Sequence, residues 1–149
     1  MANQSGRTGR STDLYINCVV LGSPRSEFTF LRNVFGPVGI RMHHAECLDE
    51  ADLLLTVTES TVLLSNVVFE DGSWHDAISL LSQRHPLVTM LVIADHAELP
   101  FLGDLFSRGA CGVLWKPFEF AAVRRMIRAV HEASQERRAL QEERSMTSV

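Results

Sequence analysis

The sequence consists of short, almost uninterrupted apolar runs that alternate with longer segments of helical periodicity. A run such as Thr89-Met90-Leu91-Val92-Ile93-Ala94 lacks the polar and apolar alternation of a half-exposed strand. It is typical of a strand that is buried on both faces. Such strands need a covering layer on each side of their sheet, and the helical segments between them supply it. The alternation therefore predicts an α/β architecture.

Five segments are expected to be strands and five to be helices. The strands are predicted over Leu14 to Leu21, Ile40 to Glu46, Thr61 to Val67, Val88 to Ala94 and Cys111 to Trp115. The helices are predicted over Ser26 to Phe35, Leu48 to Thr58, Trp74 to Arg84, Leu99 to Arg108 and Phe118 to about Glu143. Because a helix joins each strand to the next, the sheet should be parallel. We predict a three-layer αβα sandwich with a five-stranded parallel sheet, a flavodoxin-like topology and an extended C-terminal helix.

The 149 residues are enough for one domain with a sizeable core. Residues 1–12 are polar and aperiodic and are expected to form a disordered leader, followed by the domain over 13–131. Residues 132–149 are expected to form a helical extension and tail, in which charged and amide side chains dominate from Ser134 onward. Two interpretations of this extension stay open: a solvated helix, and a short coiled coil with another chain.

Composition excludes several classes of function. The net charge of −4, with glutamates between the C-terminal arginines, argues against a nucleic-acid partner. No apolar run approaches the roughly 20 residues of a membrane span. The widely spaced Cys18, Cys47 and Cys111 are expected to be free thiols in the cytoplasm. The histidines lack ligand spacing, so neither a metal nor a cofactor is expected.

In an open α/β sheet the functional crevice lies at the carboxyl ends of the strands. The last predicted strand reads Gly109-Ala110-Cys111-Gly112-Val113-Leu114-Trp115-Lys116-Pro117-Phe118, with Lys-Pro-Phe opening the final helix. Pro24 follows the first strand, and an Asp71-Gly72 turn follows the third, where Ser73 and Asp76 suit a helix capping box. With the order of elements, these features resemble the receiver domains of two-component signalling over about residues 13–131.

The resemblance implies a site for phosphoryl transfer to an aspartate beside a bound Mg²⁺. The acidic pair that holds the metal falls on Leu21 and Gly22, and neither side chain carries oxygen. The aspartate falls on Asn66, or on Ser65 if the alignment shifts by one residue. An amide does not form a stable acyl phosphate, and Mg²⁺ prefers carboxylate oxygens. The chain is therefore identified as a degenerate pseudo-receiver.

Two further positions of the receiver site follow from the resemblance. The hydroxyl after the fourth strand falls on Ile93, and the phosphate-binding lysine falls on Lys116. Without neighbouring carboxylates at its own site, Lys116 is expected to pair with Asp71 or Glu70, or to donate to loop carbonyls. Pro117 is expected to follow a cis peptide bond, as in proteins of this kind.

We therefore expect a non-enzymatic signalling domain that acts by protein–protein contact without aspartate phosphorylation. Its partner is expected to be a histidine kinase, another signalling protein or a second copy of the chain. The expected contact surface consists of Phe101, Leu105, Phe106 and Trp115. Trp115 also suits a plain core position, and that interpretation is preferred.

Two alternatives stay open. In the first, phosphate or a small ligand still switches the domain near Lys116 and Asp71. The second, more remote, is a flavodoxin-like enzyme, which a co-purifying chromophore or nucleotide would reveal.

Overall fold

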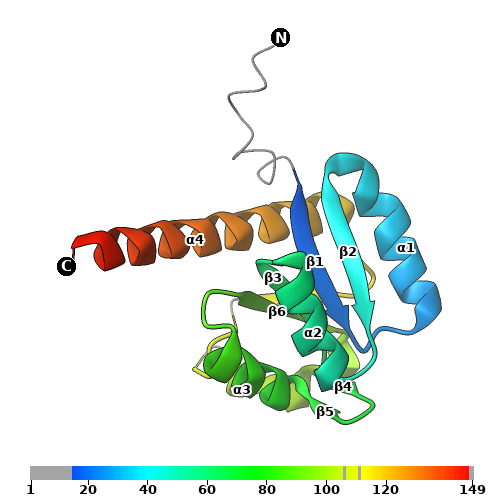
Figure 1. The fold of residues 1–149 in the computed structure, drawn as a ribbon. Coiled ribbons are helices and arrows are strands. Elements are labelled where there is room, and N and C mark those ends of the chain that lie inside the picture. Colours follow the sequence, from blue (N-terminus) through cyan, green and yellow to red (C-terminus); the bar gives the residue numbers. More distant parts are fainter. Residues whose placement is uncertain (1–14, 106, 111, 148–149) are drawn as a thin grey trace.

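The computed structural model describes residues 15–105, 107–110 and 112–147. Its main sheet contains β1 (Ile16–Leu21), β2 (Ile40–Ala45), β3 (Val62–Asn66), β6 (Thr89–Ala94) and β7 (Gly112–Trp115) (Figure 1). The strands are parallel and are ordered β2-β1-β3-β6-β7. This order is the flavodoxin-like topology that the sequence predicted. The leader predicted over residues 1–12 lies outside the described residues.

The central strands are buried along their whole length. Every residue of β3 and β6 is buried, whereas the edge strand β2 exposes Arg41. This difference explains why the central segments read as continuous apolar runs, since both of their faces carry helices. Cys18 lies in β1 with its thiol fully enclosed, and burial raises the pKa of that thiol.

Two helical layers cover the sheet. Helices α1 (Arg25–Phe35) and α4 (Phe120–Thr147) share one core, in which Phe28, Leu31 and Ile127 are buried. Helices α2 (Leu48–Thr58) and α3 (Trp74–Arg84) cover the other face, where Leu55 and Trp74 are buried. A short 3₁₀ turn, η2 (Gly36–Val38), joins α1 to β2. The predicted three-layer sandwich is confirmed.

The helix predicted over Leu99 to Arg108 is wrong. The structure instead has a 3₁₀ helix, η3 (His96–Leu102), followed by turns. Pro100 lacks a backbone N–H and disfavours helical geometry at the residue before it, and Gly103 adds conformational freedom. The chain therefore closes i to i+3 hydrogen bonds, such as the one from Leu105 N to Leu102 O (3.1 Å).

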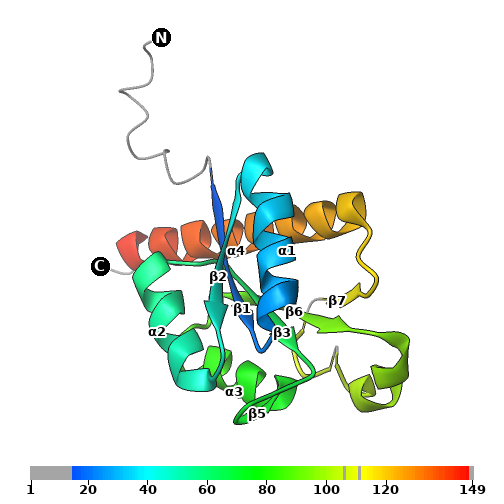
Figure 2. The same ribbon diagram turned by 90° about the vertical axis from the view of Figure 1, so that its right-hand side faces the viewer.

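A hairpin that the sequence did not predict follows β3. Strands β4 (Val68–Phe69) and β5 (Gly72–Ser73) pair antiparallel around the Asp71-Gly72 turn. The predicted capping box at the start of α3 is confirmed, because Ser73 N donates to the Asp76 carboxylate and Ser73 Oγ accepts from His75 N. Figures 1 and 2 show the hairpin at the carboxyl ends of the strands and α4 near their opposite ends.

The extended C-terminal helix is confirmed, and α4 reaches past the predicted end near Glu143. It contacts the amino-terminal edge of the sheet, where Ser134 Oγ donates to Leu87 O (2.5 Å) and Arg137 donates to Thr89 Oγ1 (2.9 Å). Farther along, Leu140 is 55% exposed and Met146 is 78% exposed. Within the described part of the chain, no helix combines the length and the apolar character needed to span a membrane.

Candidate functional site

At the carboxyl edge of the sheet, the side chain of Asn66 is buried and donates hydrogen bonds. Asn66 is the last residue of β3, and its Nδ2 lies 3.1 Å from Leu21 O and 2.9 Å from Ser23 Oγ. Asn66 is 8% exposed and Ser23 is 4% exposed. The amide therefore links the ends of β1 and β3 through two donated bonds, a role that a carboxylate cannot fill because it only accepts.

The hydrogen bonds continue from Ser23 to Lys116. Ser23 Oγ donates to Glu27 Oε2 (2.6 Å), and Lys116 Nζ donates to Glu27 Oε1 (3.1 Å). The Glu27 side chain is 15% exposed and that of Lys116 is 31% exposed. We refer to Asn66, Ser23, Glu27 and Lys116 as the strand-end network. In it, the Glu27 carboxylate balances the lysine charge in a partly desolvated setting.

The partner predicted for Lys116 was wrong. Its ion pair is with Glu27 in the first turn of α1, and not with Asp71 or Glu70. Asp71 instead accepts from Leu48 N at 3.2 Å, at the start of α2. The reason is topological, because the amino-terminal end of α1 lies at the same edge of the sheet as the end of β7.

The hairpin closes over the position where the resemblance puts the second acidic residue. Gly22 has φ of +87°, and a Cβ built on it would lie 2.6 Å from the Cβ of Phe69 in β4. A side chain at position 22 would thus meet both a strained backbone and the hairpin. A carboxylate has no room there in this arrangement.

The remaining predicted site residues do not supply oxygen ligands. The side chain of Ile93 is buried, and Ser65 Oγ turns away from the network to donate to the carbonyl of Asn66. The peptide bond from Lys116 to Pro117 is cis, as expected. The one carboxylate of the network, on Glu27, already accepts from Ser23 and Lys116. These residues do not fit a Mg²⁺ site, which is usually held by one or two carboxylates that are free to coordinate the metal.

Part of the predicted contact surface is exposed. Phe101 is 63% exposed and Leu99 56% exposed, while the half-buried Trp115 stacks on His96 with ring centroids 4.8 Å apart. Leu105 is only 2% exposed, so its prediction as a surface residue is wrong: the turn after η3 points it into the core. Phe106 lies outside the described residues.

Sequence reasoning missed Ser23, Glu27 and Phe69. A signal for the first two was available, because Ser23 and Glu27 stand four residues apart on either side of the Pro24 that opens α1. A carboxylate in the first turn of a helix that follows a strand lies near the functional edge. Phe69 gave no comparable signal, since its role depends on the hairpin.

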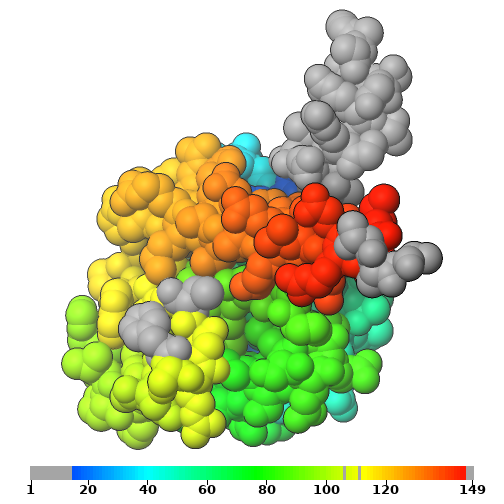
Figure 3. Space-filling view, turned by 90° about the vertical axis from the view of Figure 1, so that its left-hand side faces the viewer, coloured from blue at the N-terminus to red at the C-terminus, as the bar shows by residue number. Residues whose placement is uncertain are grey.

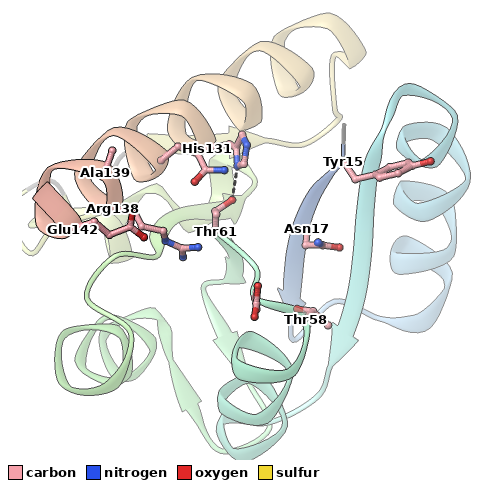
Figure 4. Close-up of a pocket in the computed structure, with 10 residues that line it drawn as sticks. Tyr15, Asn17, Thr58, Thr61, His131, Arg138, Ala139 and Glu142 are labelled. Carbon is pink, nitrogen blue, oxygen red and sulfur yellow. Dashed lines mark hydrogen bonds between the residues drawn. The ribbon is translucent and has the colours of Figure 1, made fainter. Parts of the chain in front are cut away.

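A hollow lies at the opposite edge of the sheet, beneath α4. It has a volume of about 330 Å³ and lies between the β1 end at Tyr15 and Asn17 and the α4 residues Arg138 and Glu142 (Figure 4). A hydrogen bond of 2.6 Å between Thr61 Oγ1 and His131 Nδ1 joins its walls (Figure 4). This contact holds α4 against the start of β3.

Comparisons with known proteins agree with the topology. No family model and no curated protein matches the sequence. Among solved structures, the chain is similar to the signal receiver domain of a putative LuxO repressor protein from Vibrio parahaemolyticus, with a TM-score of 0.74 and 12% identity. That match covers 85% of this chain and 98% of the other.

Two further structures show the same likeness. The signal receiver domain of an HD domain-containing protein from Pseudomonas fluorescens Pf-5 matches with a TM-score of 0.75 and 16% identity, over 85% of this chain and 93% of that one. The beryllofluoride-activated NtrC4 receiver domain dimer matches with a TM-score of 0.69 and 20% identity, over 79% of this chain and 98% of that one. The chain has the fold of a response-regulator receiver domain. Within that fold, its strand ends carry the strand-end network.

Proposed function

We propose that this chain is a signalling domain of the receiver fold that works by protein–protein contact, without phosphorylation of an aspartate and without enzymatic activity. The strand-end network carries the proposal. In it, Asn66, Ser23, Glu27 and Lys116 satisfy one another at the position where a receiver would hold its metal and phosphoryl group.

The chemistry of the network supports this function. The amide of Asn66 is a poor nucleophile, and its nitrogen donates two hydrogen bonds. Lys116 has no uncompensated charge to offer a phosphoryl oxygen, since Glu27 lies 3.1 Å from it. Binding an anion at Lys116 would require breaking a partly buried ion pair, which costs more than breaking an exposed one.

The exposed apolar side chains of η3 support contact with a protein partner. Trp74 Nε1 donates to Phe101 O (3.1 Å), so buried structure holds the backbone beneath Phe101 and Leu99. We propose that this surface receives a histidine kinase, another signalling protein or a second copy of the chain, in the cytoplasm. The free thiols of Cys18 and Cys47 suit a reducing compartment.

The test is an amide NMR titration of the full chain with Mg²⁺ and beryllofluoride, a mimic of the phosphorylated aspartate. We expect no saturable shifts at Asn66, Asp71 or Lys116. A receiver domain that carries its aspartate serves as the control for active beryllofluoride in the same buffer. Saturable shifts at those residues would overturn the proposal.

A switch by inorganic phosphate is the second candidate, because Lys116 is 31% exposed beside the network. Titration with phosphate in the absence of beryllofluoride tests it. If the candidate is correct, the wild-type chain shows saturable shifts at Lys116. If Glu27 blocks the site, only the Glu27→Gln variant shows them.

A further inference from the structure

A second hollow lies between α3, the start of β6, the segment before β7 and α4. It has a volume of about 370 Å³, which is within the range of small-molecule sites. Figure 3 shows this face of the molecule, with α4 in orange to red above α3 in green and the segment before β7 in yellow. We refer to it as the α3 hollow, and its principal lining residues are Ile78, Leu81, Val88, Met90, Arg108 and Arg137.

The apolar part of the wall belongs to the protein core. Leu81 is 6% exposed and Met90 is 1% exposed, so close packing fixes their positions. Ile78 and Val88 are half-buried and pack against the same core cluster. Because these side chains line the hollow, an apolar group placed there would cover hydrocarbon surface that water now reaches.

The α4 residue Arg137 gives the hollow a positive charge. Its Nη2 donates to Leu87 O (3.2 Å) and to Thr89 Oγ1 (2.9 Å), and both acceptors are neutral. In the part of the chain that the structure describes, no carboxylate pairs with Arg137, and its Nε and Nη1 have no acceptor. The two bonds therefore hold an exposed guanidinium at the hollow while its charge stays uncompensated.

Arg108 adds a second guanidinium, from the segment before β7. Its Nε donates to Asp104 Oδ2 (2.8 Å), and both side chains are about half exposed. Asp104 does not line the hollow, and no aspartate or glutamate is among the described residues that do. The lining thus combines an apolar wall with two arginines, one of which has no carboxylate partner.

This combination selects a ligand with two chemical parts. We propose that the α3 hollow binds a small organic carboxylate with an apolar body. Its carboxylate accepts hydrogen bonds from Arg137 and Arg108, because a guanidinium matches the geometry of a carboxylate. Its hydrocarbon lies against Ile78 and Val88. The hollow is at the amino-terminal end of β6, away from the strand-end network, so the proposal does not rest on the proposed function.

The first test is an amide NMR titration of the full chain with octanoate as the probe. We expect saturable shifts at Ile78, Met90 and Gly109 at millimolar concentration. The matched probes 1-octanol, which lacks the charge, and acetate, which lacks the chain, should each bind at least about tenfold more weakly. The absence of saturable shifts with octanoate, or equal binding of octanoate and either matched probe, would overturn the proposal.

The second test compares neighbouring arginines of α4 in the same titration. Arg137→Gln should weaken octanoate binding roughly tenfold, and Arg137→Lys, which keeps the charge, should bind more tightly than Arg137→Gln. Arg138→Gln is the matched control and should keep the wild-type affinity, because Arg138 lines other hollows and not this one. The spectrum of each free variant shows whether it is folded. Equal losses in Arg137→Gln and Arg138→Gln would indicate general attraction to a basic helix and contradict the site.

Discussion

At the scale of single residues, the strand-end network makes the site a structural element. Asn66 is buried and donates to Leu21 O and to Ser23 Oγ, and Glu27 is held by Ser23 and Lys116. Buried polar groups are costly when they lose a partner. We therefore expect the residues of the strand-end network to contribute to stability, and we expect a carboxylate in place of the Asn66 amide to lower it.

Asn66→Asp is expected to lower the free energy of unfolding by about 1–3 kcal/mol, since the carboxylate cannot donate to Leu21 O and adds negative charge near Glu27. Urea unfolding measures the loss. The matched control is Asn33→Asp, the same chemical change on the exposed surface of α1, which should change the value by less than about 1 kcal/mol. Equal effects of the two variants would show that the network does not stabilise the fold.

Gly22→Ala is expected to cost about 2 kcal/mol or more, because φ is +87° and the new Cβ would lie 2.6 Å from the Cβ of Phe69. Gly103→Ala is the control: its φ is −54°, and nothing lies within 4 Å of the added Cβ. Thermal or urea unfolding compares them. A Gly22→Ala protein as stable as the wild type would mean that the hairpin is not closed over Gly22.

At the scale of elements, η3 stands where the sequence predicted a longer helix. Backbone hydrogen bonds between described residues of the segment after it include those from Arg108 N to Asp104 O and from Ala110 N to Leu105 O. The indole N–H of Trp74 provides a tether from the core to Phe101 O. The apolar surface at Leu99 and Phe101 thus rests on a short helix with one buried anchor.

Trp74→Phe is expected to speed hydrogen exchange of the amides over residues 102–110 and to lower the free energy of unfolding by about 1 kcal/mol or more, because it removes the donor to Phe101 O and leaves a void. Hydrogen exchange read by mass spectrometry measures this change. Amides of α1, which packs in the other core cluster, are the internal reference. An equal increase in α1 and in 102–110 would indicate general loosening and contradict a local tether.

At the scale of the whole molecule, two shifted groups make the folded state less stable in acid. Burial, and then the nearby Arg41 guanidinium, lower the pKa of His43. Below about pH 6.5 this histidine is protonated in the unfolded chain, whereas in the folded chain it stays neutral down to its lowered pKa. Acid therefore favours the unfolded chain, and the free energy of unfolding falls as the pH drops through about 6.5. Hydrogen bonds from His85 and Arg84 lower the pKa of Asp52. The stability that this carboxylate adds to the folded state is fully present above about pH 3.9, the pKa of an unperturbed aspartate, and is lost as the pH falls further.

His43→Gln is therefore expected to lose less stability than the wild type between about pH 7.5 and 5.5, because glutamine keeps a donor for Asn17 Oδ1 without titrating. Urea unfolding at several pH values gives the two slopes. If His43→Gln keeps the wild-type slope, His43 does not contribute to the acid sensitivity.

Most of the fold could be predicted from the sequence. The apolar runs that became β1, β3 and β6 are continuous because both faces are buried, and this property is local enough to be visible along the chain. The absence of carboxylates at Leu21, Gly22 and Asn66 is likewise a matter of residue identity. The helix predicted over Leu99 to Arg108 is wrong for a different reason. The apolar spacing there suits a helix, but Pro100 and Gly103 favour tighter turns.

Only the tertiary structure decided which groups meet at the strand ends. Lys116 and Glu27 are 89 positions apart and pair because the sheet order brings the end of β7 and the start of α1 to one edge. Phe69 closes over Gly22 because β4 pairs with β5, a contact that no periodicity announces. The sequence by itself determined the layers and the side-chain chemistry at Leu21, Gly22 and Asn66, since burial and chemistry are properties of each residue. The strand-end network depends on distances between segments, and those exist only in the folded chain.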